Sequence, residues 1–217
     1  MSRPLDRTVS LPELGAVDRE NGEFWSENAF TMIKEGNNVS AYERNRVFLN
    51  TGDGMDFLDA SFASAADIDS DSRSAIVADF DQDGWPDLLV GSVGGGPLRL
   101  FLNNAARENH RIVVKLVGTS SNRHAVGSRV TVECGEDRII RDLFKANGHH
   151  DQSPGSLLVG VGKAQEVDRL VVRWPTGKEQ VFTNLPVDSR IELTEGEQDA
   201  AIESLDGLGD LVRNGEH

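Results

Sequence analysis

The sequence has a single cysteine, Cys134, and no long uncharged apolar run. One cysteine excludes an intrachain disulfide and any cysteine-rich zinc site, and its place in the alternating run 130–134 indicates an ordinary strand residue. No segment approaches the roughly eighteen uncharged residues that a transmembrane helix requires. The N-terminal residues show no apolar signal-peptide core, so the sequence as given predicts a soluble chain without a targeting segment.

Positive charge is also scarce in this chain. Its 22 Lys and Arg residues against 36 Asp and Glu residues give a formal net charge of -14, and the sequence pI is near 4.7. Nucleic acids and anionic membranes are bound by clustered Lys and Arg, so this balance argues against both as partners and favours cations or basic surfaces. The 38% of hydrophobic residues among 217 suffice for the core of one large domain or two ordinary ones.

The densest acidic stretch is a nine-residue segment with the sequence Asp79-Phe80-Asp81-Gln82-Asp83-Gly84-Trp85-Pro86-Asp87. In a tight loop, side chains at positions 1, 3, 5 and 9 and the carbonyl at position 7 can converge on one Ca²⁺, and glycine at position 6 allows the sharp turn. The expected ligands are therefore Asp79, Asp81, Asp83, the Trp85 carbonyl and Asp87. An EF-hand has Glu at position 12, whereas Val90 stands there in an apolar run typical of a buried strand. We expect a strand, a Ca²⁺ loop and a second strand; a solvated acidic turn is the alternative.

Two other segments are weaker candidates for metal binding. The stretch Asp67-Ile68-Asp69-Ser70-Asp71 lacks the glycine of the first loop, and we interpret it as an exposed acidic turn. The loop with His149-His150-Asp151, for which His124 is a further candidate ligand, carries two adjacent imidazoles that bind one metal only if the backbone bends strongly. We interpret it as a structural or recognition loop. Because no other set of residues forms a credible acid–base or nucleophilic site, the chain is expected not to be an enzyme.

Short apolar runs separated by turn residues indicate an all-β chain. The sequence of residues 46–50 is echoed by residues 99–103, and the turn signals at 51–54 and 94–97 fall between them. Repeats of this kind are typical of propeller blades. From residue 110 onward, longer runs alternate with a period of two, as in Ile112/Val114/Leu116, Val130/Val132 and Leu170/Val172/Trp174. With turns at 134–137, 174–178 and 184–187, they predict a small antiparallel β-sandwich or barrel of six or seven strands, with Trp174 in its core.

Five motifs in a fixed order resemble a known family: residues 45–50, the loop 79–87, residues 100–104, residues 117–130 and Val172-Arg173-Trp174-Pro175-Thr176-Gly177. The series resembles an FG-GAP/VCBS repeat followed by an ASPIC/UnbV domain, the arrangement of the family named for cartilage acidic protein 1, which has bacterial members. The resemblance implies a propeller-type blade with a Ca²⁺ loop and then an all-β domain, in proteins that are generally secreted and take part in binding and adhesion. Members usually carry a signal peptide and many blades, which this sequence does not show.

Together these observations predict a division into an irregular or partly helical lead-in (1–40), an FG-GAP/VCBS-like unit (41–105), an ASPIC/UnbV-like domain (109–194) and an acidic tail (195–217) with one weak amphipathic helix after Ala200. The expected function is a non-enzymatic Ca²⁺-binding module for protein or glycan binding and adhesion, extracellular or periplasmic by resemblance. The alternative is a metal-dependent enzyme or accessory subunit that uses His149-His150-Asp151. A single blade leaves sheet edges open, so self-association or docking to another subunit is expected.

Overall fold

The computed structural model describes residues 44–52, 56–68, 72–92, 98–104, 108–146 and 151–205. Within these ranges the chain forms thirteen strands and no helix, which confirms the all-β fold; the described part accordingly holds no helix long and apolar enough to cross a membrane. The lead-in expected at 1–40 lies outside the described residues. The chain divides into two compact units, Met1–Arg73 with Val90–Arg99, and Ser74–Leu89 with Leu100–His217.

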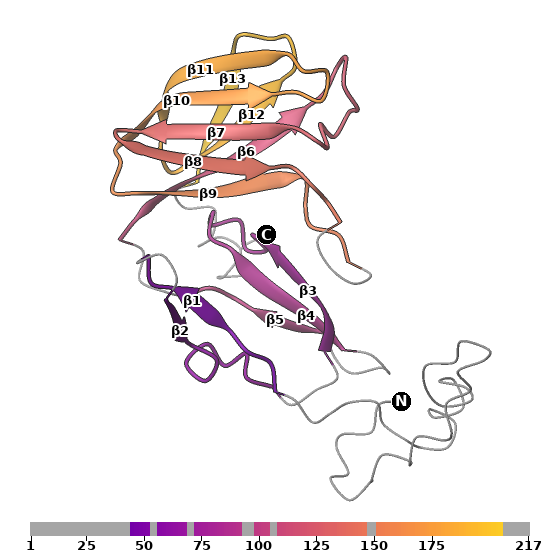
Figure 1. Ribbon diagram of the computed structural model, residues 1–217, viewed down its shortest axis with the longest axis vertical. Coiled ribbons are helices and arrows are strands. Elements are labelled where there is room, and N and C mark those ends of the chain that lie inside the picture. Colours follow the sequence, from indigo (N-terminus) through magenta and orange to yellow (C-terminus); the bar gives the residue numbers. More distant parts are fainter. Residues whose placement is uncertain are drawn as a thin grey trace, which may run out of the picture. The chain divides into compact units, whose positions relative to one another are not determined.

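The first five strands form a hairpin and a small sheet (Figure 1). Their bounds are β1 (Phe48–Asn50), β2 (Phe57–Asp59), β3 (Ser72–Ala78), β4 (Asp87–Ser92) and β5 (Arg99–Phe101). β1 and β2 pair antiparallel, and the Thr51 N–H donates to the Asp56 carbonyl at 3.2 Å, so the turn expected after residue 50 is present. The other three strands form a sheet of order β3-β4-β5. Each of the two echoed sequence segments thus contributes a strand, β1 and β5, and no closed propeller is formed by the residues described.

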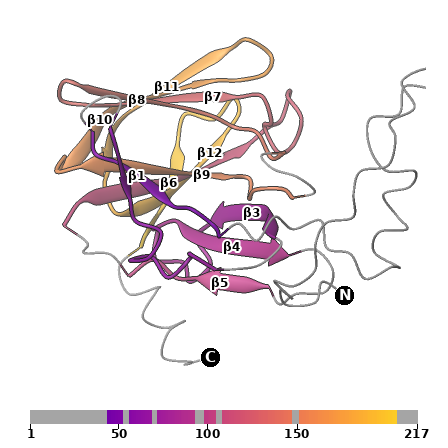
Figure 2. The same ribbon diagram turned by 60° about the horizontal axis from the view of Figure 1, so that its bottom comes forward.

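The remaining eight strands form two four-stranded sheets. Their bounds are β6 (His110–Val117), β7 (Arg129–Cys134), β8 (Asp137–Asp142), β9 (Ser156–Gly162), β10 (Glu166–Arg173), β11 (Glu179–Pro186), β12 (Ser189–Thr194) and β13 (Ala200–Ser204). One sheet has the order β11-β10-β7-β8 and the other β13-β12-β6-β9. The two sheets lie as separate layers of a β-sandwich (Figures 1 and 2), and one hydrophobic cluster takes residues from both.

Period-two alternation places the apolar side chains of the central strands in this core. Ile112 and Val114 of β6 are fully buried, as are their counterparts in β7 and β10, namely Val130, Val132, Leu170 and Val172. Trp174 is 2% exposed, and its N–H and carbonyl bond to Lys178 and Gly177 in the turn that leads to β11. The expected core residues and this turn are confirmed.

Three details of the sandwich differ from the sequence predictions. β6 and β12 pair in parallel within otherwise antiparallel pairings of the sandwich, because the long connection between them allows both to run the same way. The turn expected at 184–187 is displaced: β11 continues to Pro186, and the chain reverses at Asp188 with φ 51°. The helix expected after Ala200 is wrong, since residues 200–204 form edge strand β13 on β12, where pairing outweighs intrinsic propensity.

Candidate metal centre

The acidic loop connects two strands, as the sequence predicts. β3 ends at Ala78 and β4 begins at Asp87, so the loop spans the turn between them. Two residues adopt left-handed backbone conformations, Gln82 with φ 63° and Gly84 with φ 83°. The Gly84 N–H donates to Asp79 Oδ2 at 3.0 Å, and the Trp85 N–H donates to Asp83 Oδ1 at 2.8 Å. Short Asp side chains that accept nearby backbone N–H groups hold the loop in its tight conformation.

Three of the four loop aspartates bring their carboxylates together. One oxygen each from Asp79, Asp81 and Asp87 lies within 4.8 Å of the other two. Asp81 and Asp87 are 1% and 2% exposed, and the side chain of Asp79 is 8% exposed. At an effective dielectric constant near 20, two unit negative charges at this separation repel by about 3.5 kcal/mol. This group can hold a metal ion, because a bound cation would turn that repulsion into attraction.

The carboxylate oxygens of Asp79 and Asp87 differ in their hydrogen bonding. Asp87 accepts the N–H of Phe80 and the N–H of Asn103, each at 2.8 Å, one on each oxygen. Asp79 Oδ1, by contrast, is buried and has no hydrogen-bond partner in the structure described. Arg190 Nη2 lies 4.0 Å from the other oxygen, Oδ2, of Asp79. Burying a carboxylate oxygen without a partner costs free energy, and a cation bound beside this atom would offset that cost.

The environment of Asp79 also affects its protonation. Burial raises the pKa of the Asp79 carboxyl, and the neighbouring carboxylates of Asp83 and Asp81 raise it further. The hydrogen bond from Gly84 and the charge of Arg190 act in the opposite direction but do not cancel the increase in pKa. An ion bound beside Asp79 would favour its charged form.

Asp83 and Trp85, the two other expected ligands, have different surroundings. Asp83 is 2% exposed but does not belong to the converging group. Its carbonyl accepts hydrogen bonds from Nε, at 3.0 Å, and Nη2 of Arg111. The same guanidinium lies over the Trp85 ring, with Cζ 5.4 Å from the ring centroid. The roles of Asp83 and of the Trp85 carbonyl as ligands stay predictions.

Sequence reasoning missed the residues that support the loop. Period-two alternation predicts Arg111 only as a polar residue beside Ile112, and Leu205 falls in the weak helix expected after Ala200. A Cβ atom built on Gly84 would lie 2.6 Å from Leu205 Cδ1 and 2.8 Å from Arg111 Nε, so both side chains pack directly against the loop. A period-two pattern shows which face a side chain occupies, but not that a loop about thirty residues earlier covers that face.

The structure adds little support for metal binding at the other candidate segments. Asp67 forms an ion pair with Arg44 at 2.7 Å, and the rest of its acidic stretch, residues 69–71, lies outside the described residues. His149 and His150 also lie outside them. Asp151 Oδ2 accepts the N–H of Ala75 in β3 at 3.1 Å, which is a structural contact. Cys134 is buried, and burial raises the pKa of its thiol, which disfavours the reactive thiolate.

The described chain is all-β, with an acidic strand–loop–strand unit followed by a β-sandwich. This is the arrangement that the resemblance to an FG-GAP repeat followed by an ASPIC/UnbV domain implies. Residues 36–90 match the FG-GAP-like repeat, and residues 118–200 match the ASPIC and UnbV domain. The chain carries these two modules in this order, which confirms the recognition of the FG-GAP and ASPIC/UnbV families from the sequence. Membership of the family named for cartilage acidic protein 1 stays a prediction, and no curated protein matches the chain. The acidic loop lies in the FG-GAP match, whereas Arg111 and Leu205 lie outside both matches.

Proposed function

We propose that the loop 79–87 binds one Ca²⁺ and that this ion stabilises a non-enzymatic β module. Asp79, Asp81 and Asp87 supply the first ligands, and the Asp83 side chain and the Trp85 carbonyl complete the set. The observation that carries the proposal is the convergence of three buried carboxylates, one with an unpartnered oxygen on Asp79. We assign no metal-binding or catalytic role to the segment His149-His150-Asp151.

The chemistry of the donors favours calcium over transition metals. Every donor in the group is a carboxylate oxygen, and hard oxygen donors suit Ca²⁺ and Mg²⁺, whereas zinc, copper and iron sites in proteins draw on imidazole or thiolate. A loop that offers several carboxylates and a carbonyl fits the six to eight oxygen ligands of Ca²⁺. Mg²⁺ usually keeps several of its waters and takes only one or two carboxylates. We therefore assign the site to Ca²⁺.

The exposed apolar surface of the β1–β2 hairpin supports a role in protein or glycan binding and in adhesion. Phe48, Leu49, Phe57 and Leu58 are each more than half exposed, and Phe62 just after the hairpin is 90% exposed. Isolated exposed apolar side chains are ordinary, but several on one hairpin mark an interaction surface. We assign this surface to self-association or to docking on another subunit. FG-GAP repeats are typically extracellular, and we place the chain in the extracellular space or the periplasm.

The calcium assignment is tested by metal analysis and thermal unfolding of the purified protein. We expect calcium to co-purify or to bind on titration, and EDTA to lower the Tm. Because binding to the folded state alone adds RT ln(1 + [L]/Kd), a hundredfold excess of Ca²⁺ over Kd adds roughly 2.7 kcal/mol to the free energy of unfolding. Asp81→Asn should abolish this Ca²⁺-dependent increase, whereas Asp137→Asn, at an exposed position in the β7–β8 hairpin, should retain it. Stoichiometric zinc, copper or iron with no response to Ca²⁺ would refute the assignment and favour the metal-dependent enzyme.

A further inference from the structure

We propose that Arg111 is a positioning residue of the cation site. It fixes the second half of the acidic loop, so that cation binding is coupled to the start of β6 in the sandwich. This inference rests on the proposed function of the loop and adds to it a residue that neither family match covers. The loop 79–87 and Arg111 belong to the same compact unit of the chain.

The contacts of Arg111 with the loop are made by three parts of its guanidinium group. Nε donates to the Asp83 carbonyl at 3.0 Å, Nη2 donates to the same oxygen, and the plane of the group lies over Trp85. The Arg111 side chain is 13% exposed, so these contacts are largely screened from water. Two donors and one stacking surface define both the position of the Asp83–Trp85 backbone and its orientation. Lys has neither the forked donors nor the planar face.

Asp188 holds the guanidinium from the opposite side. Its Oδ1 accepts Arg111 Nη1 at 2.6 Å, and its Oδ2 lies 2.6 Å from His110 Nδ1. The backbone of Asp188 donates to the Arg111 carbonyl at 2.7 Å and accepts the Leu205 N–H at 2.9 Å. Asp188 therefore connects β6, the turn before β12 and the residue after β13. An arginine fixed in this way is already oriented before the loop binds an ion, which lowers the cost of ordering the loop.

At Gly84 the loop packs closely against Leu205 and Arg111. Any Cβ atom there would overlap Leu205 Cδ1 and Arg111 Nε, and Leu205 is itself 2% exposed. A side chain at position 6 of the loop would therefore force Leu205 or Arg111 to shift. Since Gly84 also donates to Asp79, a shift of its backbone would displace one of the three converging carboxylates.

The direction in which Ca²⁺ affinity changes when Arg111 is replaced separates a positioning role from a purely electrostatic one. A guanidinium near a cation repels it, so an electrostatic account predicts that removing Arg111 strengthens Ca²⁺ binding. Positioning predicts the reverse. Residues that orient metal ligands from outside typically contribute about 10- to 100-fold to metal affinity.

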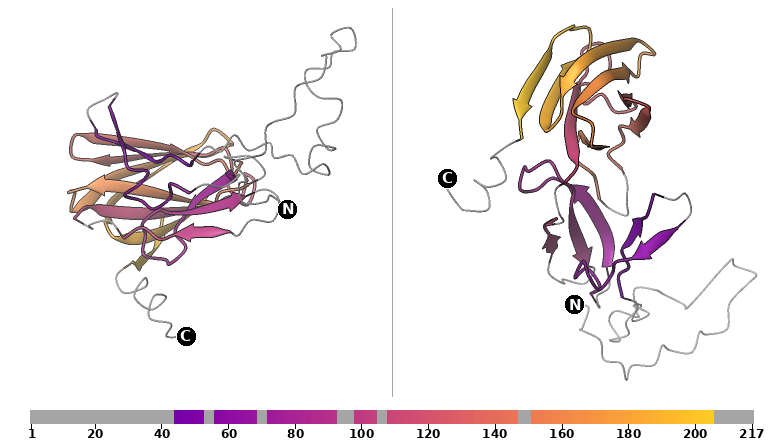
Figure 3. Two further views of the ribbon diagram at one scale, coloured as in Figure 1. Left: turned by 90° about the horizontal axis from the view of Figure 1, so that it is seen from below. Right: turned by 90° about the vertical axis from the view of Figure 1, so that its left-hand side faces the viewer.

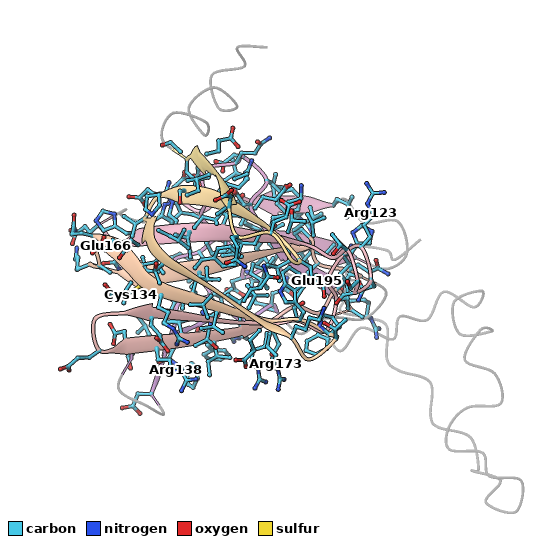
Figure 4. The ribbon with its side chains drawn as sticks, turned by 90° about the horizontal axis from the view of Figure 1, so that it is seen from above. Arg123, Cys134, Arg138, Glu166, Arg173 and Glu195 are labelled. Atoms are coloured by element: carbon cyan, nitrogen blue, oxygen red, sulfur yellow. The ribbon has the colours of Figure 1, made fainter. Side chains whose placement is uncertain are left out.

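The experiment measures Ca²⁺ affinity by calorimetric titration at 25 °C and the Tm in EDTA and in Ca²⁺, for the full chain. Arg111→Lys and Arg111→Met should bind Ca²⁺ about 10- to 100-fold more weakly. Asp188→Asn, which removes the negative charge of the anchor without changing the loop, should weaken binding by a smaller factor. Arg173→Lys is the matched control, because Arg173 is exposed and points away from the body of the sandwich (Figure 4). Its affinity should equal that of the wild type.

The Ca²⁺ affinities and the Tm values of these variants test the role of Arg111. Variants at Arg111 that bind Ca²⁺ as tightly as the wild type, or more tightly, overturn the inference. So does a Tm lowered equally in EDTA and in Ca²⁺ with unchanged affinity, because that pattern indicates a structural role alone. If Arg111→Met does not fold, Arg111→Lys and Asp188→Asn decide by the same criteria. A wild-type chain that binds no Ca²⁺ overturns the proposed function itself and removes the basis of the inference.

Discussion

Glu195 accepts a hydrogen bond of 2.6 Å from the backbone N–H of Ser121, 74 residues earlier in the chain. The same carboxylate oxygen accepts the N–H groups of Thr119 and Ser120 at 3.1 and 2.9 Å, and its other oxygen accepts two hydroxyl groups, from Ser121 and Thr176, at 3.0 Å each. Three successive N–H groups that face one anion form a backbone nest. Glu195 is 5% exposed. It therefore fastens the loop after β6 to the end of β12.

Removing the charge of Glu195 should destabilise the sandwich. Glu195→Gln places an NH₂ group against a cluster of donors, and we expect the free energy of unfolding in urea to fall by about 2–4 kcal/mol. Glu166→Gln is the matched control, because Glu166 is exposed and lies at the opposite end of the sandwich (Figure 4). Equal stabilities of the two variants would show that the nest contributes nothing.

The same carboxylate predicts a specific dependence on pH. Burial raises the pKa of Glu195, but the hydrogen bonds from Ser121, Thr119 and Thr176 lower it to about 2, below its ordinary value of 4.5. A group whose folded pKa is lowered stabilises the protein fully above its unfolded pKa and loses that contribution as pH falls toward the folded pKa. The difference in unfolding free energy between wild type and Glu195→Gln should be constant from pH 7 to about 5 and shrink between pH 4.5 and 2. A difference that does not change down to pH 2.5 would contradict this assignment.

Gly84 should tolerate alanine less well than a glycine with the same backbone angle elsewhere. Gly84 and Gly177 have φ values of 83° and 85°, but only at Gly84 does an added Cβ meet other atoms within 4 Å. The left-handed conformation costs each alanine variant about 1–2 kcal/mol. Gly84→Ala should lose further stability through the overlap with Leu205 and Arg111, and should bind Ca²⁺ more weakly. Urea unfolding with and without Ca²⁺ tests this, and equal losses for both variants would refute the steric part.

Trp174 should behave as a core residue. Because it is 2% exposed and lies in the hydrophobic cluster, truncation to alanine should cost about 3–5 kcal/mol. Val181→Ala, at a position that is 44% exposed, should change stability by much less. Chemical denaturation followed by circular dichroism measures both variants. A Trp174→Ala protein as stable as the wild type would contradict the assignment.

Self-association should depend on the apolar hairpin. Phe57 and Leu58 are each 60% exposed, so replacing both with serine removes apolar surface without opening a core. We expect light scattering across a concentration series to show an increase in mass for the wild type and a smaller one for this double variant. A wild-type chain that stays monomeric at every concentration would refute self-association.

Local patterns were enough to predict much of the fold. Period-two alternation identified the core-facing residues of β6, β7 and β10, although Val113 and Thr131 on the opposite faces are buried as well. The glycine-containing turn after Trp174 identified a hairpin. Both signals depend on residues close in sequence. Such patterns do not tell which strands become neighbours in the two sheets of the sandwich, whose ribbons Figure 3 shows from two further sides. The parallel pairing of β6 with β12 joins residues far apart in sequence, and alternation is the same for either strand direction. β13 was missed because its short apolar run fits a weak helix as well as an edge strand.

For the candidate metal site, the sequence predicted the donors and not their support. The spacing of aspartates with Gly84 in register placed the loop between two strands, and three of those aspartates converge. Arg111 and Asp188 act through contacts made only after the sandwich has folded. No spacing rule connects them to the loop, so only the three-dimensional structure reveals them.

The pairing of β6 with β12, which lies far along the chain, also means that the sandwich is completed late during synthesis. β6 is a central strand, with Ile112 paired to Ser189 of β12 on one side and to Val159 of β9 on the other. A ribosome that adds about 5–20 residues per second releases β6 several seconds before β12. Until then one edge of β6 has no partner, and such an edge can pair with other chains. We therefore expect a chain that ends before residue 189 to expose this edge and to aggregate.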